Sequence, residues 1–325
     1  MMPDPVRNAR ILRRLRKIRM KTDRDAAFVA HLDRLLERDA AGALLPVPLR
    51  FSSERETRGV MVIDGPGGGK TTLIADALES HPALGAGGPS GTCYLGASVP
   101  SPATFKSMGR TLLERSGYPI VSKDGEGWRI WAVLRGRLRQ LGIAVLWIDE
   151  AHDLFCADRN LILRALKSLM QGDEAVIVIL SGTERLREIV RSDPQVQRRF
   201  STLSLPPVSV ATDGAEFEAM IAGFCDIAGL QPPQDEDLIA RLVHAGRYRF
   251  GRCIEAVIGA IERALDGDAR ELDIGHFAES WALQEGCAMG KNIFRSSDWA
   301  QIDPDRSDDE DSTDMAPRSR RRSRR

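Results

Sequence analysis

A glycine-rich loop between a predicted strand and a predicted helix constrains this chain more than any other feature. The segment "GPGGGKTT" occupies residues 65–72, after the apolar run "GVMVI" and before "LIADAL", which has helical spacing. With no side chains in the way, the backbone N–H groups of such a loop can converge on an anion, and the following helix N-terminus favours negative charge there. The order of strand, loop and helix therefore predicts a phosphate-binding loop.

The residue types in this loop predict binding of ATP with Mg²⁺. Lys70 can reach the β- and γ-phosphates, and the Thr71 hydroxyl can ligate Mg²⁺. The chain has Asp64 where the pattern G-x-x-x-x-G-K-[ST] has its first glycine, so a carboxylate lies beside the expected triphosphate and bears on nucleotide affinity. The predicted nucleotide-binding residues are Gly65, Pro66, Gly67, Gly68, Gly69, Lys70, Thr71 and Thr72.

A second motif supplies the carboxylates that ATP hydrolysis needs. The run "VLWIDEAH", residues 145–152, reads as a buried strand that ends in two acidic residues. Asp149 would hold the Mg²⁺ shell, and Glu150 would orient and activate the attacking water. A core strand can also end in a solvated acidic pair, but its combination with the loop indicates a hydrolytic site.

The pattern along the chain predicts an α/β fold with further segments at both ends. From residue 59 apolar strands alternate with helical patterns, which predicts a parallel sheet flanked by helices. We expect four parts: a basic helical N-terminal arm and linker (1–50), a nucleotide-binding domain (51–210), a smaller all-helical lid domain (211–290), and a disordered tail, acidic and then arginine-rich (291–325).

Charge clusters at the N-terminus, although the whole chain is balanced with 46 basic and 46 acidic residues. The segment "RNARILRRLRKIRMK", residues 7–21, holds eight basic and no acidic side chains. Such a helix can bind a polyanion or can be a solvated helix face, and both interpretations stay open. The longest apolar runs are too short to span a bilayer, so we expect a cytoplasmic protein without a membrane partner.

The letters "DEAH" at 149–152 also suggest a helicase, but that interpretation fails on length. Helicases with this signature need two α/β domains. Only about 140 residues follow the "SGT" at 181–183, and they contain no second parallel-sheet pattern.

The order of these elements resembles that of AAA+ ATPases. By this resemblance Thr183, at the end of "VIVILSGT", is a first sensor of the γ-phosphate, and "GRYRFGRCIEAVIGAI" (246–261) supplies Arg252 as a second sensor. In "DPQVQRRF" (193–200), Arg199 is the first candidate and Arg198 the second for an arginine that enters the neighbouring subunit's nucleotide site. More narrowly, the basic N-terminal helices, "IDEAH", "SGT" and the helical lid resemble the TniB family of transposition ATPases.

This resemblance implies an ATP-dependent, DNA-binding regulator of transposition. It would assemble as a homo-oligomer on double-stranded target DNA, recruit or activate a partner transposase, and hydrolyse ATP slowly with stimulation by DNA. One alternative is an AAA+ assembly or secretion-type ATPase that acts on protein partners. Another is a nucleotide-binding switch that never hydrolyses, against which the presence of Glu150 argues.

Overall fold

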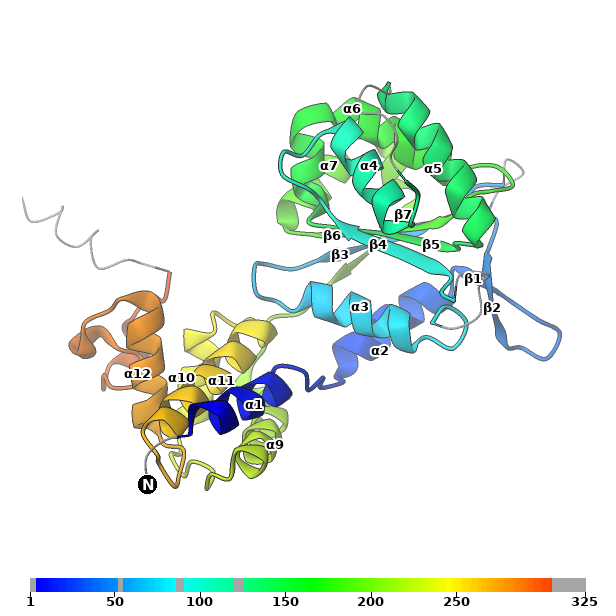
Figure 1. Cartoon of the computed structure of the whole chain (residues 1–325). Coiled ribbons are helices and arrows are strands. Elements are labelled where there is room, and N and C mark those ends of the chain that lie inside the picture. Colours follow the sequence, from blue (N-terminus) through cyan, green and yellow to red (C-terminus); the bar gives the residue numbers. More distant parts are fainter. Residues whose placement is uncertain (1–3, 52–54, 86–90, 120–125, 306–325) are drawn as a thin grey trace, which may run out of the picture. The chain divides into compact units, whose positions relative to one another are not determined.

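The computed structural model describes residues 4–51, 55–85, 91–119 and 126–305. The chain forms two compact units (Figure 1). The sheet unit comprises Lys21–Pro206, and the helical unit combines Met1–Met20 with Pro207–Arg325. No helix within the described ranges is both long and apolar enough to cross a membrane.

A five-stranded parallel sheet forms the centre of the sheet unit. Its strands, in spatial order, are β4 (Tyr94–Ser98), β5 (Val145–Asp149), β6 (Ile177–Gly182), β3 (Gly59–Ile63) and β7 (Phe200–Ser204). The helices that follow these strands are α3 (Lys70–Ser80), α4 (Phe105–Arg115), α5 (Gly127–Leu141), α6 (Ala151–Leu169), α7 (Glu184–Arg191) and α8 (Pro194–Gln197). The predicted α/β fold with a flanked parallel sheet is confirmed.

Helices cover both faces of this sheet, which is why its inner strands are continuously apolar (Figure 1). On β3, Met61 and Ile63 pack into one core with side chains of α4, α5, α6 and α7. Val60 and Val62 point to the opposite face, where they pack with side chains of α3 and of α2 (Asp23–Asp33). The first residue of β3, Gly59, has no room for a side chain, because a Cβ there would lie only 2.2 Å from the carbonyl oxygen of Val178.

Parallel pairing brings the carboxyl ends of several strands to one edge of the sheet. Ile63, the last residue of β3, pairs with Gly182, the last residue of β6, and Ile148 of β5 pairs with Leu180. In open parallel sheets the segments that leave this edge form the ligand-binding crevice. The loop after β3, the acidic pair after β5 and Thr183 after β6 therefore share one edge.

The N-terminal segment is divided between the two units. After α2, the hairpin of β1 (Leu36–Arg38) and β2 (Leu44–Pro48) also belongs to the sheet unit. In contrast, α1 (Pro5–Leu15) belongs to the helical unit, where Leu12 and Leu15 are buried in the core. The segment 1–50, expected to form a single arm, is therefore divided into two parts, one in each unit. The reason is that α1 and α2 each bury apolar side chains in the core of their own unit.

The helical unit is built from α9 (Val210–Ala228), α10 (Leu238–Ala245), α11 (Phe250–Asp266) and α12 (Ile274–Glu285), with short 3₁₀ turns η1 (Met289–Lys291) and η2 (Trp299–Gln301). The helix α1 packs against α9 and α11. Asn8 strengthens this contact, since its buried side-chain amide donates to the carbonyl oxygen of Leu265 at 3.2 Å.

Part of the expected disordered tail packs on this unit. Asn292, Ile293 and Phe294 are buried, and the Arg241 guanidinium donates to the carbonyl oxygens of Ile293 and Ser296. The first part of the segment is therefore anchored through 305, because a few apolar side chains precede the acidic run. The remainder, residues 306–325, lies outside the described residues.

Candidate functional site

The loop from 64 to 69 joins β3 to α3 and encloses the amino group of Lys70. Gly67 and Gly69 have φ values of +74° and +90°, which favour glycine. Lys70 is only 5% exposed. Its Nζ atom donates to the carbonyl oxygens of Asp64 at 3.0 Å and Gly65 at 2.9 Å. An ammonium group has three donors, so these two described bonds leave one donor for a ligand.

Asp64 turns its carboxylate onto its own loop. The side chain is 7% exposed, and Oδ1 accepts the Gly65 N–H at 2.7 Å. A Cβ on Gly68 would lie 1.8 Å from Oδ2 of Asp64, so the carboxylate can occupy this position only beside a glycine. The departure from the loop pattern at residue 64 is thus accommodated by a second glycine four residues later.

Asp149 is the centre of a buried hydrogen-bond network. Its Oδ2 accepts from the Thr71 hydroxyl at 2.7 Å, which links β5 to the first turn of α3. Its Oδ1 accepts from the Ser181 hydroxyl at 2.6 Å and from the Glu150 N–H at 3.0 Å. Ser181 in turn accepts from the indole N–H of Trp147 at 2.8 Å. Sequence reasoning missed Ser181 and Trp147, although both belong to motifs that it used.

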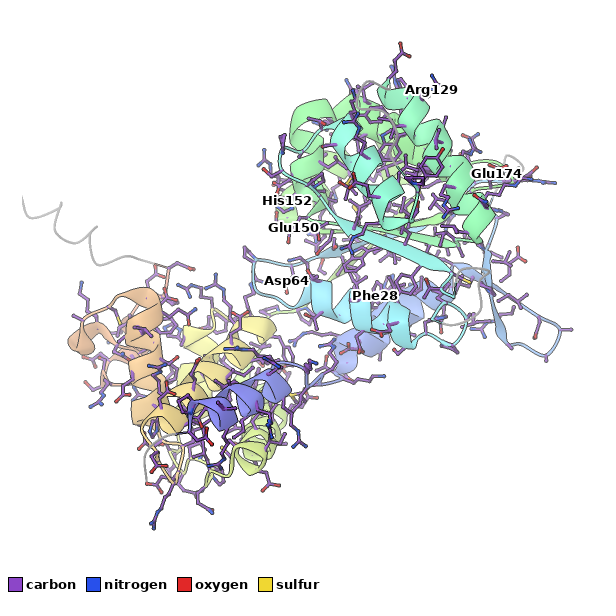
Figure 2. The ribbon with its side chains drawn as sticks, in the orientation of Figure 1. Phe28, Asp64, Arg129, Glu150, His152 and Glu174 are labelled. Carbon is purple, nitrogen blue, oxygen red and sulfur yellow. The ribbon has the colours of Figure 1, made fainter. Side chains whose placement is uncertain are left out.

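Glu150 occupies a strained backbone conformation at the same edge (Figure 2). Its φ and ψ values are +53° and +37°, the left-handed region that non-glycine residues rarely adopt. Such conformations cluster at functional sites, where the surrounding structure enforces them. The carboxylate side chain is 45% exposed and lies 3.4 Å from the Nδ1 atom of His152. The surrounding structure therefore enforces a strained backbone that places a half-exposed carboxylate directly after Asp149.

Thr183 follows β6 and is the N-cap residue of α7, without a side-chain bond that caps the helix. The loop lies nearby, because the Asp64 N–H donates to the carbonyl oxygen of Gly182 at 3.2 Å. The structure thus brings together the loop, Asp149, Glu150 and Thr183.

Arg198 and Arg199, the two arginines before β7, lie at the amino-terminal ends of the strands, opposite to the loop. Phe200 pairs with Gly59, the first residue of β3, whereas the loop follows the last residue of that strand. Arg199 is 6% exposed, pairs with the carboxylate of Glu56 and donates to the Lys167 carbonyl oxygen. Arg198 also contacts Glu56, at 2.8 Å, but its side chain is 60% exposed. Glu56 is a further residue that sequence reasoning missed.

Arg252 belongs to the helical unit. It is partly buried in the first turn of α11. Its contact with a nucleotide stays a prediction.

The residues at the loop fit ATP and Mg²⁺. Mg²⁺ prefers oxygen ligands and is usually held by one or two carboxylates together with phosphate oxygens and water. The Thr71 hydroxyl and Asp149 carboxylate supply such oxygens in direct contact with each other. The loop supplies glycine N–H groups and Lys70 at a helix N-terminus, which suits phosphate.

Comparison with known proteins agrees with this arrangement. A family model described as "Bacterial TniB protein" matches residues 40–210, more than half of the chain. A search of curated proteins finds no match.

Among solved structures, the chain resembles the Aeropyrum pernix ORC1 protein in complex with DNA, with a TM-score of 0.59 and 15% identity over 80% of this chain and 65% of that one. It also resembles the Aeropyrum pernix ORC2 protein in its ADPNP–ADP complexes, with a TM-score of 0.55 and 14% identity over 89% and 70% of the two chains. The chain therefore spans about two thirds of the length of these proteins. At such identities the likeness shows the fold alone.

Proposed function

The chain belongs to the bacterial TniB family, and from this premise we propose that it is an ATP-hydrolysing, DNA-binding regulator of transposition. The observation that carries the proposal is the direct contact of Thr71 with Asp149, beside the strained Glu150. A phosphate-binding loop, a cation site and a candidate base thus lie at one edge of the sheet.

The residues at this edge divide the chemistry of hydrolysis among them. Lys70 and the glycine N–H groups bind the phosphates of ATP. Thr71 and Asp149 would hold Mg²⁺, which would supply positive charge to neutralise the phosphate oxygens. Glu150 orients the attacking water and takes its proton, for which its half-exposed carboxylate has access to solvent. Thr183 and Arg252 are proposed to hydrogen-bond the γ-phosphate.

The position of the arginines supports a site completed by a second copy of the chain. Arg198 and Arg199 lie near the first residue of β3, whereas the loop follows its last residue. The five residues of β3 therefore separate the arginines from their own loop by a distance of about 17 Å at the usual rise per residue. An arginine there is too far away to reach its own loop, and we propose that it serves the loop of a neighbouring subunit. Because Arg199 is buried against Glu56, we propose the more exposed Arg198 for this role and Arg199 as the second candidate.

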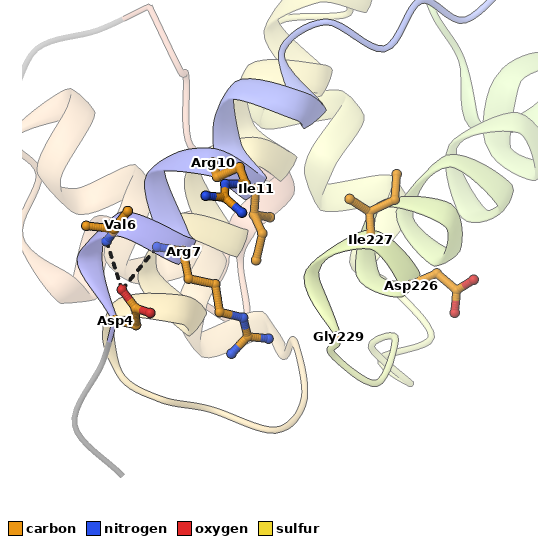
Figure 3. A pocket seen from close by; sticks show the side chains of 8 residues that line it. All are labelled: Asp4, Val6, Arg7, Arg10, Ile11, Asp226, Ile227 and Gly229. Atoms are coloured by element: carbon orange, nitrogen blue, oxygen red, sulfur yellow. Dashed lines mark hydrogen bonds between the residues drawn. The ribbon is translucent and has the colours of Figure 1, made fainter.

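The exposed basic residues of α1 are the observation that supports our proposal of double-stranded DNA as the partner. Asn8, Leu12 and Leu15 are buried. The rest of α1 exposes Arg7, Arg10, Arg13 and Arg14, and Arg16 and Lys17 are exposed directly after the helix. A cleft of about 340 Å³ between α1 and the end of α9 is lined by Arg7 and Arg10 together with Asp4 and Asp226 (Figure 3). A second cleft of about 410 Å³ is lined by Arg13, Arg16 and Lys17 together with Glu262, which lies 3.7 Å from Arg16. These exposed cations outnumber the carboxylates beside them and can neutralise backbone phosphates with salt-dependent affinity.

A direct test follows phosphate release and the anisotropy of a labelled duplex with ATP, with ADP and without nucleotide. We expect hydrolysis that DNA stimulates and ATP-dependent assembly on the duplex. Hydrolysis without affinity for duplex at low salt would favour the alternative of an AAA+ ATPase that acts on protein partners. For the partner transposase, we expect an integrase-like gene among the neighbouring reading frames.

A further inference from the structure

The hydrogen bonds that converge on Asp149 have fixed directions. An indole N–H only donates, and an ionised carboxylate only accepts. Since the Ser181 hydroxyl has one proton and lies between Trp147 and Asp149, it must accept from the indole and donate to the carboxylate. The hydrogen bonds from Trp147 through Ser181 to Asp149 can therefore run in only one donor-to-acceptor direction.

These hydrogen bonds engage Oδ1 of Asp149, and the other carboxylate oxygen, Oδ2, faces α3. Oδ1 accepts from Ser181 and from the Glu150 N–H, whereas Oδ2 accepts only the Thr71 hydroxyl among the contacts described. Ser181 is fully buried and Asp149 nearly so, so water does not substitute readily for the serine hydroxyl. The orientation of the carboxylate is therefore set from the sheet side.

We propose that Ser181 and Trp147 are positioning residues for the cation site, which hold Oδ2 of Asp149 toward Thr71 and thereby set the Mg²⁺ concentration that nucleotide binding requires. This inference rests on the proposed ATP site. Trp147 acts through Ser181, because its ring is packed in the core beneath α3 and only its N–H takes part. Neither residue touches the nucleotide in this proposal.

A purely structural role for Ser181 makes a different prediction. In that case the hydroxyl merely satisfies the buried indole N–H, and its loss lowers stability without any change in Mg²⁺ dependence. The chain offers a matched control in Thr57, whose buried hydroxyl donates to the Val176 carbonyl oxygen at 2.6 Å in the same unit. Thr57→Val deletes an equally buried hydrogen bond away from the cation site.

The experiment measures binding of a fluorescent ATP analogue to the full chain as Mg²⁺ is varied, together with the melting temperature of each variant. In Ser181→Ala we expect the half-saturating Mg²⁺ concentration to rise about tenfold, the size typical of a lost hydrogen bond to a charged group. Affinity at saturating Mg²⁺ should stay close to that of the wild type. Ser181→Thr should restore the wild-type Mg²⁺ dependence, and Thr57→Val should lower only the melting temperature.

A second variant keeps the test decisive if Ser181→Ala does not fold. Trp147→Phe keeps an aromatic ring but removes the indole N–H, and we expect a smaller rise of about threefold in the half-saturating Mg²⁺ concentration. Wild-type Mg²⁺ dependence in the folded variants would overturn this inference and leave the ATP site standing. A wild-type chain that does not bind the analogue with Mg²⁺ would overturn the proposed function, and this inference with it.

Discussion

The Thr71 hydroxyl donates a 2.7 Å hydrogen bond to Oδ2 of Asp149, which joins the first turn of α3 to the end of β5. The two residues are 78 positions apart in the chain and come from the two motifs that the sequence singles out. Their contact turns two separate motifs into one candidate site for a cation and a triphosphate.

Lys70→Ala should weaken ATP binding by about a hundredfold, because a charged donor to the phosphates is lost. Lys70 also binds two carbonyl oxygens of its own loop, so the loop should become less ordered as well. Calorimetric titration measures the affinity, with Lys106→Ala on α4 as a control. Equal affinity of Lys70→Ala and the wild type would remove the assignment of the loop.

Glu150→Gln should lower the rate of hydrolysis at least a hundredfold and keep ATP binding, since the amide preserves the shape and loses the base. Single-turnover phosphate release separates this effect from binding. Normal turnover in this variant would mean that another residue activates the water.

The backbone at Glu150 adds a test of strain. Glu150→Gly should raise the free energy of unfolding by about 1 kcal/mol, because glycine adopts the left-handed conformation without strain. Glu150→Ala is the matched control, which loses the carboxylate but keeps the strain. Both variants should be inactive, and equal stability of the two would contradict the strain at this residue.

Arg198→Ala should bind ATP as the wild type does but lose DNA-stimulated hydrolysis, because its charge is needed in the neighbouring site. Arg199→Ala should instead lower stability by about 2 kcal/mol, since it removes one of the two arginine partners of the buried Glu56. Denaturation and ATPase assays distinguish the two. A mixture of Arg198→Ala with Lys70→Ala should partly recover activity; no recovery would argue against a composite site.

Replacing Arg10 and Arg14 by glutamine should lower the slope of log affinity for duplex DNA against log salt by about one unit per lost phosphate contact. These residues are exposed on α1, so the fold should be retained. Deleting residues 1–21 is a less specific test, because it also removes Leu12 and Leu15 from a core. Arg270→Gln, an exposed position of the same unit, serves as the control. An unchanged slope in the double variant would show that Arg10 and Arg14 are solvated and do not contact DNA phosphates.

Burial raises the pKa of the Cys225 thiol to about 11. The thiolate is the reactive form, so native Cys225 should resist iodoacetamide at pH 8.5, whereas the partly exposed Cys287 reacts. Because the raised pKa favours the protonated thiol in the folded state, its contribution to stability is complete below about pH 9 and decreases as the pH rises toward 11. Mass spectrometry of labelled peptides measures this, with urea-unfolded protein as the reference. Rapid labelling of Cys225 in the native chain would contradict the packing of α9.

The cation-site network could be predicted only in part. Lys70, Thr71, Asp149 and Glu150 are recognisable because local patterns of strand, loop and helix carry them. Ser181 and Trp147 belong to the same motifs, but their contact depends on the pairing of β5 with β6, in which Trp147 lies opposite Ile179. Strand register is a property of the assembled sheet, and no local pattern specifies which polar groups it brings together.

The sequence by itself determined the fold class, the phosphate-binding loop and the acidic strand end, because each depends on neighbours within a few residues. Only the tertiary structure decided that Arg199 is buried with Glu56, that α1 docks in the helical unit, and that residues 292–294 are anchored there. The physical reason is common to all three. An apolar seam or a charge shows that a partner is required, but burial of that seam or pairing of that charge depends on residues far away in the chain.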